Sequence, residues 1–150
     1  MENLLISRCL LGENVKYNGK NNYNPKVEIL KKYYNLIPIC PEVLGGLSIP
    51  RIPSEIILNT TAVINKESQD VTKEFTLGAK LSLDIAKKYN VKLALLKDGS
   101  PSCGSSYIYD GTFTSIKVNG YGITTRLLIE NNIKVYNENE IDYLIEKFED

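Results

Sequence analysis

Four short apolar segments alternate with amphipathic helical patterns, and this alternation limits the fold of the chain more than any other feature. The segments lie at residues 4–7, 36–39, 91–96 and 133–136. Strands that are joined through helices of ten or more residues need crossover connections, which favour a parallel sheet with helices on its faces. The sequence therefore predicts a single-domain α/β protein with a Rossmann-like, three-layer fold and a mainly parallel sheet.

Capping residues and apolar spacing locate the expected helices. Asn24 and Pro25 predict the start of a helix that reaches Tyr34. A second helix is expected from Thr72 to about Tyr89, and a third at residues 123–130. The apolar stripe predicted for the second helix consists of Leu77, Leu81, Ile85 and Tyr89. Asn137 and Glu140 form a predicted capping pair for the last helix, whose stripe consists of Ile141, Leu144, Ile145 and Phe148.

Proline and glycine mark the less regular parts of the chain. Pro38 is disfavoured inside a central strand, because proline has no N–H to donate. The glycine-rich run at residues 40–46 predicts a turn, and Pro50 and Pro53 predict irregular structure up to Asn59. Residues 107–109 are expected to be extended.

Composition excludes several classes of protein. A length of 150 residues suits one domain. The formal net charge is 0, so the chain does not have the excess of basic residues that is typical of a dedicated nucleic-acid-binding protein. The chain has no histidine, which excludes Ser-His-Asp and Cys-His nucleophile systems and imidazole metal sites. No apolar run approaches the length needed to span a bilayer. An odd number of cysteines and the absence of a secretory signal predict a cytoplasmic location.

The three cysteines each follow a different predicted strand within a few residues. Cys9, Cys40 and Cys103 stand in turns rich in glycine or proline. Ligands of parallel sheets bind beyond the carboxyl ends of the strands, so the three thiols are expected to converge there. A reducing compartment and an unpaired third thiol disfavour a disulfide.

Three thiolates without histidine are compatible with two kinds of metal site. Zinc with three cysteines and a water would form an open site of the catalytic type, although paired Cys-x-x-Cys spacing is absent. An iron–sulfur cluster accepts ligands from separated loops, and three cysteines would leave one iron of a [4Fe–4S] cube without a protein ligand. Such an iron is a Lewis acid with high affinity for sulfur.

Five motifs in order resemble those of the thiouracil desulfurase family, over residues 4 to about 137. Two motifs surround Cys9 and Cys40, at residues 7–12 with 16–19 and at residues 40–47 with 50–53. The third motif consists of Lys97 and residues 100–105, and the last two motifs lie at residues 108–113 and 120–124.

This resemblance implies an enzyme with an oxygen-sensitive [4Fe–4S] cluster held by Cys9, Cys40 and Cys103. Glu42 and Ser100 occupy the positions of the family's catalytic glutamate and serine. The implied reaction is a non-redox substitution, in which water replaces the sulfur of a thiolated pyrimidine and sulfide leaves. Residues 1–150 are accordingly expected to form one catalytic domain.

The residues around the cysteines have chemistry that suits such a reaction. Glu42, two residues beyond Cys40, can exchange a proton with water, and Ser100 or Ser102 can orient that water or the thiocarbonyl. Lys97 and Arg51 can complement a negative charge on the cluster or the substrate. Tyr109 can stack on a base, as can Tyr17 and Tyr121.

The leading expectation is desulfuration of a small substrate, either 2- or 4-thiouracil or a thiolated nucleoside such as 4-thiouridine. Desulfuration of 4-thiouridine in tRNA is the alternative, because overall neutrality leaves room for a local basic patch. Its candidate members are Lys16, Lys20, Arg51, Lys97 and Arg126. A non-catalytic iron–sulfur redox or sensor protein is a further class, although a stable electron carrier usually has four cysteines. A zinc-dependent hydrolase is the last class.

Overall fold

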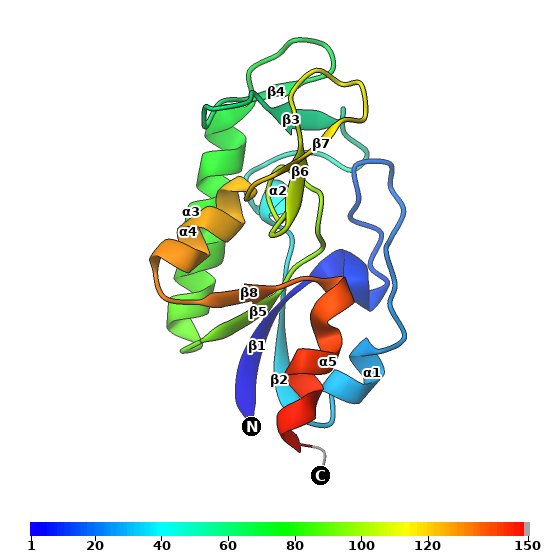
Figure 1. The fold of residues 1–150 in the computed structure, drawn as a ribbon, viewed down its shortest axis with the longest axis vertical. Helices are drawn as coiled ribbons and strands as arrows, with labels where there is room; N and C mark the ends of the chain where they lie inside the picture. Colours follow the sequence, from blue (N-terminus) through cyan, green and yellow to red (C-terminus); the bar gives the residue numbers. More distant parts are fainter. Residues whose placement is uncertain (149–150) are drawn as a thin grey trace.

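Within residues 1–148, the part of the chain that the computed structural model describes, four parallel strands form the central sheet. They are β1 (Glu2–Ser7), β2 (Tyr34–Ile39), β5 (Leu93–Leu95) and β8 (Lys134–Tyr136). Their order across the sheet is β2-β1-β5-β8 (Figure 1). The predicted α/β class with a mainly parallel sheet is confirmed.

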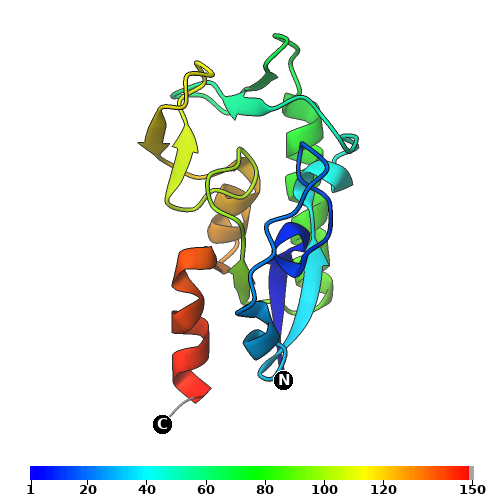
Figure 2. The same cartoon turned by 90° about the vertical axis from the view of Figure 1, so that its right-hand side faces the viewer.

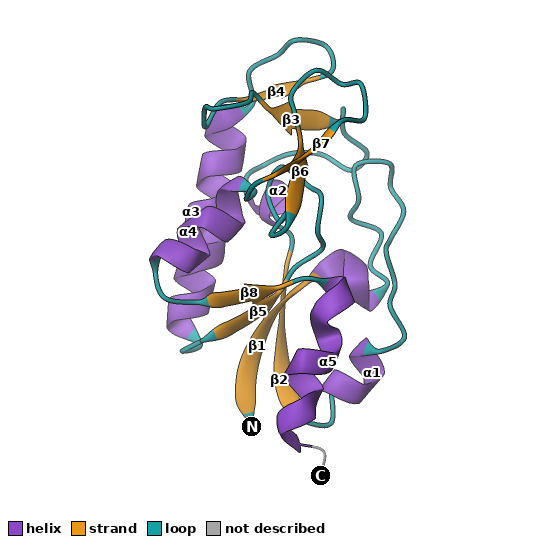
Figure 3. Cartoon of the chain, viewed as in Figure 1, coloured by secondary structure: helices purple, strands orange, loops and turns teal. Residues whose placement is uncertain are grey.

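Helices cover both faces of this sheet (Figure 3). The longer pair is α3 (Thr72–Lys88) with α4 (Ile123–Glu130), and the shorter pair is α1 (Val27–Leu30) with α5 (Ile141–Ile145). Successive side chains of β1 point to opposite faces, as in any strand. Leu4 and Ile6 pack in the cluster of α1 and α5, whereas Leu5 packs with Leu83 of α3 and Leu128 of α4. The sheet is therefore the middle layer of three.

Two antiparallel hairpins lie beyond the carboxyl ends of the parallel strands (Figures 1 and 2). One pairs β3 (Ser54–Ile56) with β4 (Val63–Asn65), and the other pairs β6 (Tyr107–Tyr109) with β7 (Lys117–Asn119). Ile56, Val63 and Ile108 of the hairpins pack with Phe75 of α3 in a small separate core. The short helical turns of the chain are η1 (Arg8–Leu11), α2 (Pro41–Leu44), η2 (Glu138–Glu140) and η3 (Glu146–Phe148).

The predicted apolar stripe of α3 is wrong at its ends, because Leu77 and Tyr89 are 47% and 41% exposed. The buried face of α3 instead consists largely of smaller residues: Phe75, Gly78, Ala79, Ser82, Leu83 and Ala86. Gly78 meets α2 backbone to backbone, since a Cβ at this position would lie 1.9 Å from the carbonyl oxygen of Pro41. This contact leaves no room for a side chain at position 78 and places this face of α3 directly against α2.

Several predicted boundaries also differ from the structure. The helix expected to reach Tyr34 is the single turn of α1, and Tyr34 begins β2 instead. The predicted turn at residues 40–46 contains α2, and β3 lies in the segment expected to be irregular. Thr72 does not cap α3. Its Oγ1 accepts a hydrogen bond of 2.9 Å from the backbone N–H of Val63.

The structure explains why proline is tolerated in β2 and confirms the predicted capping pair. Pro38 is tolerated because β2 is an edge strand of the sheet. Asn137 and Glu140 form the predicted capping box at η2, directly before α5. No helix among residues 1–148 combines the length and the apolar character that a membrane span needs.

Candidate active site

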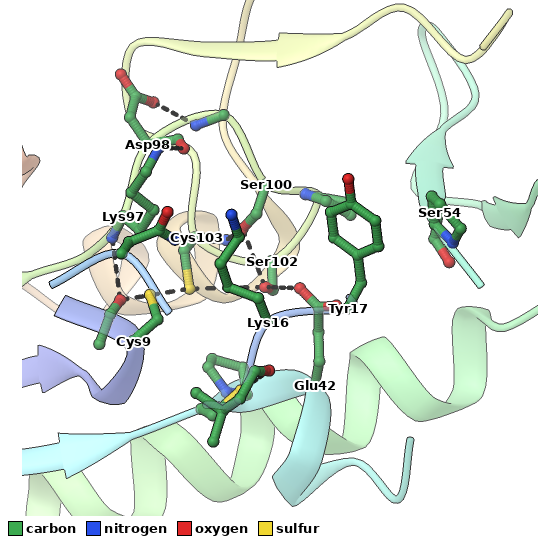
Figure 4. A pocket seen from close by; sticks show the side chains of 18 of the residues that line it. Cys9, Lys16, Tyr17, Glu42, Ser54, Lys97, Asp98, Ser100, Ser102 and Cys103 are labelled. Atoms are coloured by element: carbon green, nitrogen blue, oxygen red, sulfur yellow. Dashed lines mark hydrogen bonds between the residues drawn. The ribbon is translucent and has the colours of Figure 1, made fainter. Parts of the chain in front are cut away.

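A cavity of about 530 Å³ lies at the carboxyl ends of β1, β2 and β5. The chain leaves β1 toward β2 on one side and later reaches β5 on the other, so the loops diverge at β1 and leave a crevice. Cys9 of η1, Cys40 at the start of α2 and Cys103 after β5 all line this cavity. The structure therefore brings to one cavity the three cysteines that the sequence places at three strand ends. Figure 4 shows two of them, Cys9 and Cys103.

The surroundings of the three free thiols favour their protonated form. Burial raises the pKa of Cys9 and that of Cys40, and it raises the pKa of Cys103 to about 12. Negative charge on Cys40 raises the pKa of both Cys9 and Cys103 further. A positively charged group bound between them is what would hold all three as thiolates.

Glu42 is fixed in the cavity wall by a buried ion pair. It stands in the first turn of α2, which begins at Pro41, a residue suited to the first position of a helix. The Nε of Arg51 lies 2.9 Å from Glu42 Oε1, and the two side chains are only 7% and 14% exposed. Arg51 also donates through Nη2 to the carbonyl oxygen of Val15 at 2.8 Å. The guanidinium therefore orients Glu42 in addition to lining the cavity.

Two serines connect Glu42 to the Cys103 loop. Ser102, which is buried, donates through Oγ to the second carboxylate oxygen of Glu42 at 2.8 Å. Its Oγ lies 3.2 Å from Ser100 Oγ and 3.6 Å from Cys103 Sγ. Ser100 Oγ in turn accepts a hydrogen bond of 2.7 Å from the backbone N–H of Cys103. A carboxylate and two hydroxyls thus form one hydrogen-bonded chain beside a cysteine.

Lys97 lines the cavity near Cys9, on the side away from Glu42 (Figure 4), and is held by a second ion pair. Its Nζ lies 2.9 Å from Glu138 Oε2 and donates to the carbonyl oxygen of Asp98. Burial on its own lowers the pKa of Lys97, but Glu138 outweighs this effect and the pKa is raised. The pKa of Cys9 stays raised by burial, and the charge of the Lys97 ammonium group offsets only part of that rise.

Asp98 organises the loop that carries Cys103, a role that the sequence reasoning missed. Its carboxylate accepts hydrogen bonds from the backbone N–H groups of Ser105 and Ser106, at 2.9 and 3.1 Å, and from the Ser106 hydroxyl. Burial on its own raises the pKa of Asp98, but these hydrogen bonds outweigh it and hold the pKa below its ordinary value. An aspartate directly before Gly99 at a strand end is a sequence signal for such a turn.

The remaining predicted residues divide between the cavity and other parts of the surface. Tyr109 and Tyr17 line the cavity, and so does Lys16. Tyr109 packs edge-on against Tyr107, with ring centroids 5.9 Å apart. Tyr121, Lys20 and Arg126 are not among the lining residues of this cavity.

Comparison with known proteins agrees with this arrangement. The family model for 2-thiouracil desulfurase matches residues 4–140. The uncharacterized protein YbbK of Bacillus subtilis (strain 168) is 39% identical over 150 residues, which cover 95% of this chain and 99% of that protein. A solved structure described as the [4Fe-4S]-dependent thiouracil desulfidase TudS matches with a TM-score of 0.91 at 37% identity, covering 99% of this chain and 98% of that one. Since the matched residues include all three cysteine-bearing strand ends, the chain belongs to the 2-thiouracil desulfurase family.

Proposed function

We propose that this protein desulfurates a small thiolated pyrimidine, 2- or 4-thiouracil or 4-thiouridine, with the help of a [4Fe–4S] cluster held by Cys9, Cys40 and Cys103. The observation that carries the proposal is the convergence of these three free thiols in one cavity, beside the hydrogen-bonded pair of Glu42 and Ser102. Membership of the desulfurase family and the similarity to TudS, a [4Fe-4S]-dependent thiouracil desulfidase, support it. Residues 1–150 then act as one catalytic domain in a reducing, cytoplasmic compartment.

The donor set fits a cluster better than a single ion. Within residues 1–148, no three His, Cys, Asp or Glu side chains are arranged to hold one metal ion. A cube of four irons is larger and takes ligands from separate loops, as the three strand ends provide. When bound, a cluster with three cysteine ligands supplies an iron that can bind the substrate's sulfur and make its carbon more electrophilic.

Glu42 and the two serines carry the proton chemistry in this proposal. Glu42 accepts a proton from the attacking water, and the hydroxyls of Ser102 and Ser100 orient that water toward the ring carbon. The water oxygen forms the new bond to carbon while the carbon–sulfur bond breaks. Both protons of the water, one of them passed on by Glu42, leave with the sulfur as hydrogen sulfide, so Glu42 returns to its carboxylate form. Carbon keeps its oxidation state, so the step needs no external oxidant or reductant. The ion pair with Arg51 fixes the orientation of the Glu42 carboxylate, whose other oxygen accepts the hydrogen bond from Ser102.

The cavity suits a base or nucleoside. Its volume of about 530 Å³ falls in the range that holds small molecules. Tyr17 and Tyr109 in its lining offer faces on which a pyrimidine can stack, and Lys97 offers a positive charge. The formal net charge of 0 disfavours strong binding to a tRNA backbone, which depends on many Lys and Arg contacts.

Anaerobic purification followed by metal and sulfide analysis tests the cluster. We expect a brown protein with about four irons per chain. A colourless protein that contains zinc would contradict the proposal.

Turnover assays then test the substrate. We expect activity on 2-thiouracil, 4-thiouracil or 4-thiouridine monophosphate, with release of sulfide. Salt-sensitive activity on thiolated tRNA alone would overturn the preference for a small substrate. Iron-loaded protein that releases no sulfide from any of these compounds would favour a non-catalytic iron–sulfur protein.

A further inference from the structure

We propose that Glu55 is a positioning residue that holds the loop at residues 110–115 in place as the outer wall of the substrate cavity. The loop connects β6 to β7, and its sequence motif has no part in the chemistry described above. The inference rests on the proposed function, because it takes the cavity to be the place where the thiolated pyrimidine binds.

Glu55 joins the two hairpins through one carboxylate oxygen. Glu55 is the central residue of β3, and its Oε1 accepts hydrogen bonds from the backbone N–H of Gly111 at 2.9 Å and of Phe113 at 3.2 Å. Hydrogen bonds to an ionised acceptor are stronger than those between neutral groups. The backbones also meet closely here, since a Cβ on Gly111 would lie 2.7 Å from the carbonyl oxygen of Ile56. The loop is thereby docked on β3.

The loop has a backbone conformation that needs such support. Phe113 has a φ of 58° and Ser115 a φ of 63°, both in the left-handed region. A bulky residue is an outlier there, and the conformation persists only when its surroundings hold it. One of the two Glu55 hydrogen bonds is made to the N–H of Phe113 itself. The carboxylate therefore acts at the strained residue.

The supported residues face the cavity. Glu55, Phe113 and Ser115 line the same cavity as the three cysteines. In Figure 4, Ser54 of β3 lies on the side of the pocket away from Cys9. A wall in this position contacts the part of the substrate that is remote from Cys9. Loss of this wall should weaken binding of the substrate and of the transition state by the same amount. Such a change raises KM and leaves kcat unchanged.

The test compares two substitutions of Glu55 in the cluster-containing protein. Glu55→Ala removes the acceptor, and we expect KM for the thiolated pyrimidine to rise about tenfold, with kcat changed by less than about twofold and iron content unchanged. Glu55→Gln keeps an amide oxygen that can accept both N–H groups, so KM should return to within about threefold of the wild-type value. The matched control is Glu67→Ala, which removes an exposed carboxylate just beyond β4 and should leave KM unchanged.

Phe113 supplies a second pair of variants that leaves the carboxylate in place. Phe113→Ala removes the ring, and Phe113→Gly removes both the ring and the cost of the positive φ. We expect both to raise KM and to leave kcat and iron content unchanged. An unchanged KM in these variants, or in Glu55→Ala, would overturn the proposal. So would a parallel loss of kcat and iron content, which is what general destabilisation would cause.

Amide hydrogen exchange separates this proposal from the proposed function, because it needs no turnover. In the wild-type protein the peptide that covers residues 107–116 should exchange more slowly than in Glu55→Ala. Equal exchange rates in the two proteins would refute the positioning role of Glu55, even if the enzyme is active. Slow exchange in a wild-type protein that desulfurates no thiolated pyrimidine would instead contradict the proposed function, and with it the role of the wall in substrate binding.

Discussion

Replacing Arg51 by methionine should destabilise the protein far more than the loss of a surface ion pair does. Arg51 and Glu42 are 7% and 14% exposed, and their closest atoms are 2.9 Å apart. Removing one partner of a buried pair leaves an uncompensated charge, at a cost of about 3–5 kcal/mol. Ser102 still donates to the other carboxylate oxygen of Glu42 at 2.8 Å, which offsets part of that cost. We therefore expect the lower end, a loss of about 3 kcal/mol in the free energy of unfolding.

Equilibrium urea unfolding of the metal-free protein under reducing, anaerobic conditions measures this loss. A change of this size should also lower Tm by roughly 6–12 °C. The control is Lys80→Met, which breaks the ion pair with Asp84 on α3, where the side chains are 70% and 52% exposed. Such pairs contribute at most about 1 kcal/mol.

A double variant isolates the pairwise energy. When Glu42→Gln is combined with Arg51→Met, neither side chain of the former ion pair carries a charge. The losses in the free energy of unfolding of the two single variants should therefore not add. We expect the double variant to be more stable than the sum predicts by at least about 1 kcal/mol. A loss of less than about 1 kcal/mol for Arg51→Met alone, or simple additivity, would refute the view that the pair is buried and coupled.

Four further predictions concern the site itself. Glu42→Gln should keep the absorption spectrum of the proposed cluster and lose most turnover, because it removes the carboxylate that accepts the proton and leaves the three thiols in place. Near-full activity would exclude Glu42 as the base. Cys103→Ser should lower the iron content of anaerobically purified protein, as measured by metal analysis. The pKa of about 12 at Cys103, against its ordinary value of 9.0, means that the folded metal-free protein favours the neutral thiol. This stabilisation is complete below pH 9 and is lost as the pH rises toward 12. Between pH 8 and 10 the free energy of unfolding of the wild type should therefore fall by about 1 kcal/mol more than that of Cys103→Ser, as measured by urea unfolding. Asp98→Ala should reduce both stability and iron content, since several donors of the Cys103 loop lose their acceptor; unchanged iron content would contradict its role in that loop.

Features that depend on neighbouring residues along the chain could be predicted from the sequence. The capping box of Asn137 and Glu140 needs only four consecutive residues. The position of Cys9 and Cys103 beside one cavity follows from a general rule about parallel strands, once the strands are recognised.

Features that depend on contacts between distant segments could not be predicted in this way. The strands β3 and β7 have three residues each, too few for a periodic signal, and their hairpins are held by a core that includes Phe75 of α3. The outward position of Leu77 follows from the close approach of Gly78 to Pro41, which no spacing along α3 records. For the same reason the sequence suggested Arg51 as a contact of the substrate and gave no sign of its pairing with Glu42.

The placement of Pro38 on an edge strand also bears on how this protein behaves at high concentration. An edge strand offers unpaired N–H and C=O groups to any other chain that approaches in extended form, and this is a common start of aggregation. With a formal net charge of 0, the molecules repel one another only weakly over long distances. Pro38 removes one donor from β2, and a strand with a missing donor is a poor template for another strand. Pro38, which would be unfavourable in a central strand, therefore disfavours self-association through the edge strand β2.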